Sequence, residues 1–193
     1  MNSDPQSALT NAIDFAAEVE RLRAEVDRLE TRIAQLDQLA HEDPLVALPN
    51  RRGLMRQLEK LIDRVRRYGD QAAVLFVDVD GLKTINDSLG HPAGDKALVQ
   101  VSERLVHGVR ASDCVARIGG DEFAILLEHV DEMAARETAA RLVDGVSQCD
   151  FMHGGKLLPL SVAIGVATIL PSDRAEEVLA RADEEMYRFK TGT

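Results

Sequence analysis

Two glycines followed by two acids stand between short apolar runs in the segment RIGGDEFAILL, residues 117–127. The pattern predicts two short strands joined by a hairpin turn, in which Gly119 and Gly120 are free to adopt positive φ. A Gly-Gly turn alone is common in structural hairpins. Without Cβ atoms, however, Gly119 and Gly120 would also let the phosphates or the base of a nucleotide approach the backbone.

More acids follow a second apolar run. The segment AAVLFVDVD, residues 72–80, is typical of a buried strand, and its period of two puts Asp78 and Asp80 on one face. If this strand neighbours the hairpin, as in a βαββαβ sheet, Asp78 faces Asp121 and Glu122. Converging carboxylates repel one another unless they are protonated or bridged by a cation. An oxygen-only ligand set of this kind suits Mg²⁺.

The remaining apolar periodicity predicts an α+β domain. We expect helices at 51–68, 82–89, 93–109, 131–147 and 175–190, and strands at 72–80, 114–118, 123–127 and 157–169. The order β-α-α-β-β-α-β-α favours a ferredoxin-like arrangement, with helices over one face of a mainly antiparallel sheet.

Residues 8–40 read as one long helix before this domain. Apolar residues alternate spacings of four and three along it, which is the heptad pattern of a coiled coil. The positions are Ala8, Ala12, Phe15, Val19, Leu22, Val26, Leu29, Ile33, Leu36 and Ala40. We therefore expect a dimeric coiled coil in domain 1–42, and a globular domain at 43–193. A helix packed on its own domain is the alternative, although it would more often show a broader stripe.

Composition narrows the class of partner. The formal net charge of −10 over 193 residues argues against nucleic-acid binding, although a local cluster of basic residues and metal can still hold an anionic substrate. No apolar run is long enough to span a bilayer, so we expect no membrane insertion. Cys114 and Cys149 show no metal-ligand or disulfide spacing, which fits a reducing cytoplasm.

From Asp43 to about Lys190 the chain resembles the GGDEF-domain diguanylate cyclases. Five motifs carry the resemblance in order: DPLVALPNRR, FVDVDGLKTINDSLGHPAGD, RASDCVARIGGDEF, LSVAIGVA and ADEEMYRFK. The resemblance implies the nucleotidyl cyclase (palm-type) form of the fold. It also implies the family's reaction, in which two GTP molecules are condensed into cyclic di-GMP with release of two pyrophosphates, using Mg²⁺ or Mn²⁺.

The same resemblance assigns metal ligands. Asp78 and Asp121 look like the metal-binding carboxylates, and Val79 would contribute its backbone carbonyl. Glu122 is either a further ligand or assists deprotonation of the attacking 3′-hydroxyl, and the sequence does not separate these two catalytic roles.

Substrate contacts are implied in the same way. Asn86 and Asp95 match the residues that read guanine, and Lys83 and Lys190 match lysines near the triphosphate. A carboxylate can accept hydrogen bonds from guanine N1–H and the exocyclic amine, so such a site rejects bases that leave it unpaired. The structural alternatives are an acid favoured by a helix N-terminus for Asp95, and solvated lysines for the other two.

Arg110 and Asp113, shortly before Gly119, match the family's RxxD site for inhibitory cyclic di-GMP, and Arg141 falls where a second arginine is often supplied. A plain salt bridge at a helix end is the alternative. The chain departs from the family pattern at Val46-Ala47, which replaces the usual Thr-Gly in the segment between the long helix and the globular domain.

Each domain would hold one GTP, so two domains must meet antiparallel to form the product, and the coil would raise their effective concentration. A homodimer through the coil is therefore expected, with an unknown regulatory partner on the coil also open. Two rival hypotheses remain. One is a receptor that binds GTP or cyclic di-GMP without turnover, and the other is a coil that acts mainly as a scaffold.

Overall fold

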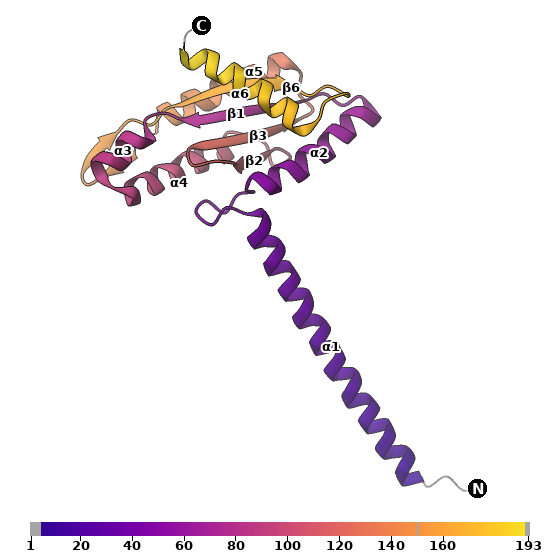
Figure 1. Cartoon of the computed structure of the whole chain (residues 1–193). Coiled ribbons are helices and arrows are strands. Elements are labelled where there is room, and N and C mark those ends of the chain that lie inside the picture. Colours follow the sequence, from indigo (N-terminus) through magenta and orange to yellow (C-terminus); the bar gives the residue numbers. More distant parts are fainter. Residues whose placement is uncertain (1–4, 150, 192–193) are drawn as a thin grey trace. The chain divides into compact units, whose positions relative to one another are not determined.

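The computed structural model describes residues 5–149 and 151–191 and divides the chain into two compact units, Met1–Ala40 and His41–Thr193 (Figure 1). Helix α1, Pro5–His41, accounts for the first unit, so the expected long N-terminal helix is confirmed. The side chains of Ala8, Ala12 and Phe15 lie outside the described part. No helix in the described ranges combines the length and apolarity needed to cross a bilayer.

Apolar side chains of the heptad pattern are exposed along α1. Leu22, Val26, Leu29, Ile33 and Leu36 are each between 47% and 66% accessible. Around them, α1 carries ion pairs between residues three apart, such as Glu18 with Arg21. These pairs lie within one helix. The exposed apolar positions therefore remain available to a partner helix, and the dimeric coiled coil stays a prediction.

The second unit is a mixed α/β domain whose four-stranded sheet has the order β2-β3-β1-β6, with every pairing antiparallel. Its elements are α2 Arg51–Tyr68, β1 Ala72–Val79, α3 Leu82–Leu89, α4 His91–His107, β2 Cys114–Arg117, β3 Glu122–Glu128, α5 Glu132–Ser147, β4 Phe151–His153, β5 Lys156–Leu158, β6 Val162–Thr168 and α6 Ala175–Thr191. The expected α+β ferredoxin-like class is confirmed, and α4 begins and ends two residues earlier than expected.

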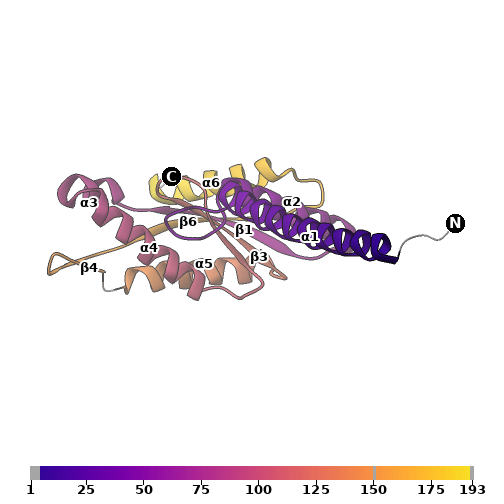
Figure 2. The same cartoon turned by 90° about the horizontal axis from the view of Figure 1, so that it is seen from below.

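The expectation of helices over one face is wrong, because both faces of the sheet are covered (Figure 2). Leu75 and Val77 point into a core shared with α4 and α5. Val74 and Phe76 point the other way, into a core shared with α2 and α6. Since β1 is apolar at odd and even positions alike, it buries both of its faces.

The single strand expected at 157–169 is also wrong. Lys156–Leu158 forms β5, which pairs with β4 in a separate two-stranded sheet, while β6 begins at Val162. Pro159 lies between them and has no backbone N–H to donate to a sheet ladder, which disfavours one continuous strand there.

Helix α6 lies close against β6 at Gly165. A Cβ atom at this position would overlap the carbonyl oxygen of Ala182 and the amide nitrogen of Met186, which are backbone atoms. The absence of a side chain at Gly165 therefore lets α6 approach the sheet and sets the position of the residues that α6 carries.

We expect Gly165→Ala to lower the free energy of unfolding by about 1–3 kcal/mol, because the added methyl must push two packed backbones apart. Gly145→Ala is the matched control, because a Cβ at Gly145 in α5 meets no atom within 4 Å. That control should gain up to about 1 kcal/mol from helix propensity. Urea unfolding measures both values, and equal effects at the two sites would contradict the close approach of α6.

Candidate active site

Sheet pairing brings the end of β1 to the hairpin between β2 and β3. Asp78 lies opposite Glu122 in the β1–β3 register. The backbone N–H of Val79 donates to the carbonyl oxygen of Asp121 at 2.9 Å. The structure thus places Asp78, Val79, Asp121 and Glu122 together, although Asp78 and Asp121 are 43 positions apart in the chain.

A lysine from α6 reaches the same strand end. The ammonium group of Lys190 pairs with the Asp78 carboxylate and lies 3.1 Å from Asp80 Oδ1. Burial lowers the pKa of Lys190, but the bonds to Asp78 and Asp80 outweigh it, so the pKa lies above its ordinary value. Asp78 and Asp80 share one face, as the strand period predicts, and Lys190 lies on these carboxylates.

The carboxylate of Glu122 lies near the negative charges of several other acids. Its pKa is raised first by burial, then by the charges of Asp121, Asp183 and Asp78, while Arg51 acts in the opposite direction. Asp183 extends from α6 and was missed by the sequence analysis. Its only sequence signal is an acid in the last helix, and the packing of α6 on the sheet is what brings it near Glu122.

The hairpin glycines act differently from what we expected, because neither Gly119 nor Gly120 adopts positive φ. A Cβ atom at Gly119 would overlap the Glu122 carboxylate, so this glycine makes room for the acid. A Cβ at Gly120 would meet no atom within 4 Å, which leaves open space beside the turn. The reason for two glycines is thus contact and access, not backbone conformation.

The donor set fits a hard divalent cation. The carboxylates at the strand end offer only oxygen ligands. The ammonium group of Lys190 is the cation that pairs with Asp78 and Asp80 in this structure. Among the described residues, no group of three or more His, Cys, Asp or Glu side chains is arranged to hold a metal ion.

The residues expected to read guanine lie where α3 meets α4. The Oδ1 atom of Asn86 is buried and has no hydrogen-bond partner among the described residues. It packs against Gly94, where a Cβ atom would overlap it, and Asp95 follows as an exposed residue of α4. Lys83 is exposed on α3. An orphaned acceptor beside an exposed acid is suited to bind a ligand with several N–H donors.

Arg110 and Asp113 lie at the two ends of one turn and are hydrogen-bonded to each other. The Asp113 carboxylate accepts from the backbone N–H of Arg110 at 2.9 Å and from that of Glu128 at 3.2 Å. Arg141 donates to the carbonyl oxygen of Gly108 at 2.6 Å, which holds it near the same turn. The Arg110 side chain is exposed. The salt bridge considered as an alternative is not among the ion pairs of the described side chains.

A groove of about 560 Å³ lies beside this turn. It is lined by Leu48, Pro49, Gln57, Val106, His107, Val109, Arg110, Ala111, Asp113, Cys114 and Val115. Burial raises the pKa of the Cys114 thiol to about 11, so this residue stays protonated at neutral pH. The groove thus combines apolar walls with an exposed guanidinium at its edge.

Known proteins are similar to this chain in sequence and in fold. Residues 40–193 match the family model described as diguanylate cyclase, GGDEF domain. The chain is 40% identical over 176 residues to the bifunctional diguanylate cyclase/cyclic di-GMP phosphodiesterase MucR of Pseudomonas aeruginosa, covering 88% of this chain and 25% of MucR. It covers 23% and 41% of two further curated relatives, DgcP and TpbB of the same species.

Solved structures agree in fold. The coiled coil and GGDEF domain of DgcB from Caulobacter crescentus, in complex with cyclic di-GMP, matches with a TM-score of 0.86 and 25% identity over 92% of this chain and 95% of that one. The diguanylate cyclase SiaD of Pseudomonas aeruginosa, in complex with its activator SiaC, matches with a TM-score of 0.77 and 28% identity over 97% and 75%. The chain belongs to the GGDEF-domain family of diguanylate cyclases.

Proposed function

We propose that this chain is a diguanylate cyclase that converts two GTP molecules into cyclic di-GMP and two pyrophosphates. The observation that carries the proposal is the register of Asp78 opposite Glu122, beside the Val79–Asp121 hydrogen bond. In each half-reaction a 3′-oxygen forms a bond to the α-phosphorus of the other GTP, and the bond from that phosphorus to pyrophosphate breaks.

Asp78, Asp121, the Val79 carbonyl and Glu122 would hold Mg²⁺ or Mn²⁺, which supplies charge neutralisation on the triphosphate when bound. The raised pKa of Glu122 suits it to take the proton of the 3′-hydroxyl, because a general base works best when its pKa lies near the operating pH. Lys190, released from Asp78, would turn its ammonium to the phosphates, with Lys83 beside them. The open space at Gly120 would admit the nucleotide.

Guanine recognition would fall to Asn86 and Asp95. The buried Oδ1 of Asn86 lacks a partner and can accept a hydrogen bond from the base. Asp95 can accept from N1–H and the exocyclic amine. A base without these donors would leave the buried Asn86 acceptor unpaired, which disfavours its binding.

Because one domain holds one nucleotide, the reaction needs two copies. We propose a homodimer through α1, whose apolar positions are exposed, in a cytoplasmic enzyme. The neighbouring SiaD structure contains an activator, which supports the idea that a regulatory partner acts on chains of this kind. Product would also bind at Arg110, Asp113 and Arg141 beside the groove, and would inhibit the enzyme.

Incubation of the purified chain with GTP and Mg²⁺, followed by nucleotide analysis, tests the reaction. We expect cyclic di-GMP and pyrophosphate from wild type, and a loss of at least about a hundredfold in Asp121→Asn, because a metal contact stabilises the transition state by several kcal/mol. Glu137→Gln, which changes an exposed acid of α5, should keep full activity. GTP binding without pyrophosphate release, after bound product is removed, would instead support the receptor.

The raised pKa of Glu122 predicts a pH-dependent stability difference in metal-free protein. Its destabilising effect is absent below the unfolded pKa near 4.5 and develops as pH rises through the higher folded pKa. In EDTA, Glu122→Gln should melt above wild type at pH 8, and the difference should vanish near about pH 4. A lower melting temperature for Glu122→Gln at pH 8 would contradict the repulsion.

Gly94→Ala should weaken GTP binding roughly tenfold, because the added methyl displaces the Asn86 amide and removes one hydrogen bond to the base. Titration with a non-hydrolysable GTP analogue measures the affinity. If Gly94 acts through Asn86, the same substitution in an Asn86→Ala background should have no further effect. Additive losses in the double variant would show that Gly94 acts independently.

A further inference from the structure

The residues that follow α1 fold into a compact loop, His41–Asn50, which we call the hinge loop. Its two ends are joined by the Asn50 N–H, which donates to the His41 carbonyl at 2.8 Å. Inside it, one carboxylate oxygen of Asp43 accepts from the N–H groups of Leu45 at 2.9 Å and Val46 at 3.1 Å. The Asp43 carboxylate therefore helps to fix the conformation of the loop.

Ala47 shows how firmly the hinge loop is held. Its φ is +51°, a left-handed conformation that costs an alanine about 1–2 kcal/mol relative to the right-handed region. The resemblance described above places glycine at this position. Such a conformation persists in a non-glycine residue only where the surrounding contacts fix it.

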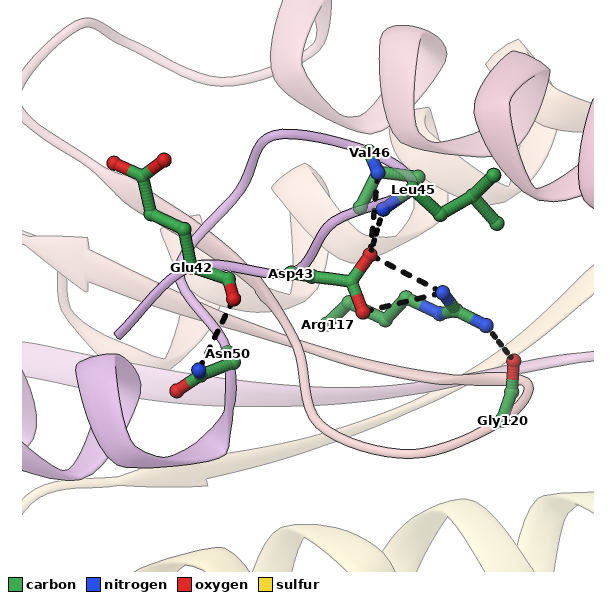
Figure 3. Close-up of polar contacts among 7 residues, drawn as sticks. All are labelled: Glu42, Asp43, Leu45, Val46, Asn50, Arg117 and Gly120. Atoms are coloured by element: carbon green, nitrogen blue, oxygen red, sulfur yellow. Dashed lines mark hydrogen bonds and ion pairs between the residues drawn. The ribbon is translucent and has the colours of Figure 1, made fainter. Parts of the chain in front are cut away.

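Arg117 joins this loop to the hairpin (Figure 3). Its Nη1 atom lies 3.2 Å from both carboxylate oxygens of Asp43. Its Nη2 atom donates to the Gly120 carbonyl at 2.8 Å, and its backbone N–H donates to the Pro49 carbonyl at 2.9 Å. One residue thus contacts the hinge loop twice and the hairpin turn once.

The bridge is well shielded from water. The Arg117 and Asp43 side chains are only 14% and 17% exposed. The Nε atom of Arg117 is buried without a hydrogen-bond partner among the described residues, so the guanidinium is kept there despite a cost. A lysine cannot replace it, because a single ammonium lacks the planar fork that reaches Asp43 and Gly120 together.

The hairpin is fixed at two points next to its acids. Gly120 is held by Arg117, and the next residue, Asp121, accepts from Val79 through its carbonyl. Loss of the Arg117 contact would leave the turn held by the Val79–Asp121 bond and by the Ile118 and Gly119 N–H groups, which donate to the Glu122 carbonyl. The orientation of Asp121 and Glu122 therefore depends on a residue whose other partner is Asp43 in the hinge loop.

We infer that Arg117 is a positioning residue that couples the hinge loop to the Gly120 carbonyl, so that the state of the loop after α1 sets the geometry of Asp121 and Glu122. The catalytic consequence rests on the proposed cyclase function, but the coupling itself does not. Asp43 has no hydrogen bond or ion pair with the hairpin among those of the described residues except through Arg117. A change at Asp43 should thus be felt 75 positions away, around Ile118.

Hydrogen–deuterium exchange on the full chain tests the coupling. Asp43→Asn keeps an oxygen for Leu45 and Val46 but removes the charge that binds Arg117. We expect at least about tenfold faster exchange of the Ile118 and Gly119 amides, which are bonded to the Glu122 carbonyl. Arg117→Lys should give the same result. Protection unchanged within twofold in both variants would overturn the inference.

Two controls separate coupling from general loosening. Arg181→Lys breaks a comparable fork, in which Arg181 binds both Asp173 oxygens and the Thr168 carbonyl, away from the hairpin. Asn50→Asp removes the Asn50 contact to the Glu42 carbonyl, within the hinge loop but not through Arg117. Neither should change exchange at the hairpin, even at an equal loss of melting temperature. Equal acceleration in Arg181→Lys would reduce Arg117 to a structural role.

Kinetics then test the catalytic consequence. In Asp43→Asn and Arg117→Lys, kcat should fall at least about tenfold while KM for GTP changes less than threefold, and the double variant should be no worse than Arg117→Lys. Wild-type turnover with unaffected variants would refute the inference and leave the proposed function standing. Absence of product from wild type would refute the proposed function, while the exchange experiment would still decide the coupling.

Discussion

Negative charge concentrated at one end of β1 is the constraint on which the rest of the site depends. Asp78 lies beside Asp121 and Glu122, and such a group of carboxylates is unfavourable without a cation. In this structure Lys190 supplies the positive charge. A cation that binds here would therefore compete with the Lys190 ammonium for the carboxylates of Asp78 and Asp80.

The packing of the domain explains how these charges are held in place. β1 is paired on both edges and covered on both faces, so its backbone has little freedom to move. The close approach of α6 at Gly165 then fixes where Lys190 and Asp183 can reach. A tightly packed interior deforms little, and this stiffness lets like charges remain close together.

Much of this arrangement could be predicted from the chain alone. The apolar run of β1 and its period of two correctly put Asp78 and Asp80 on one face. The error about the faces of the sheet came from the same run, because an uninterrupted apolar strand already indicates burial on both sides. Pro159 should likewise have ended the strand expected there. Both signals are local in the sequence.

Other features were beyond local reasoning because they depend on residues far apart in the chain. Nothing near Gly119 in sequence separates a positive φ from the need to clear the Glu122 carboxylate, since both leave a glycine. Asp183 and Arg117 acquire their neighbours only through the packing of α6 and the hinge loop. Sequence patterns predict elements and faces well, whereas side-chain partners across the sheet require coordinates.

The hairpin is the point where two distant parts of the domain meet. β1 contributes the Val79 N–H, the hinge loop acts through Arg117, and Glu122 fills the space that Gly119 leaves. Since β1 and the hinge loop are separate segments, a shift in either of them changes the same short turn. A turn that is held only by its own strands would be insensitive to events elsewhere. This one is built so that the loop next to α1 has direct access to it, through a single buried guanidinium.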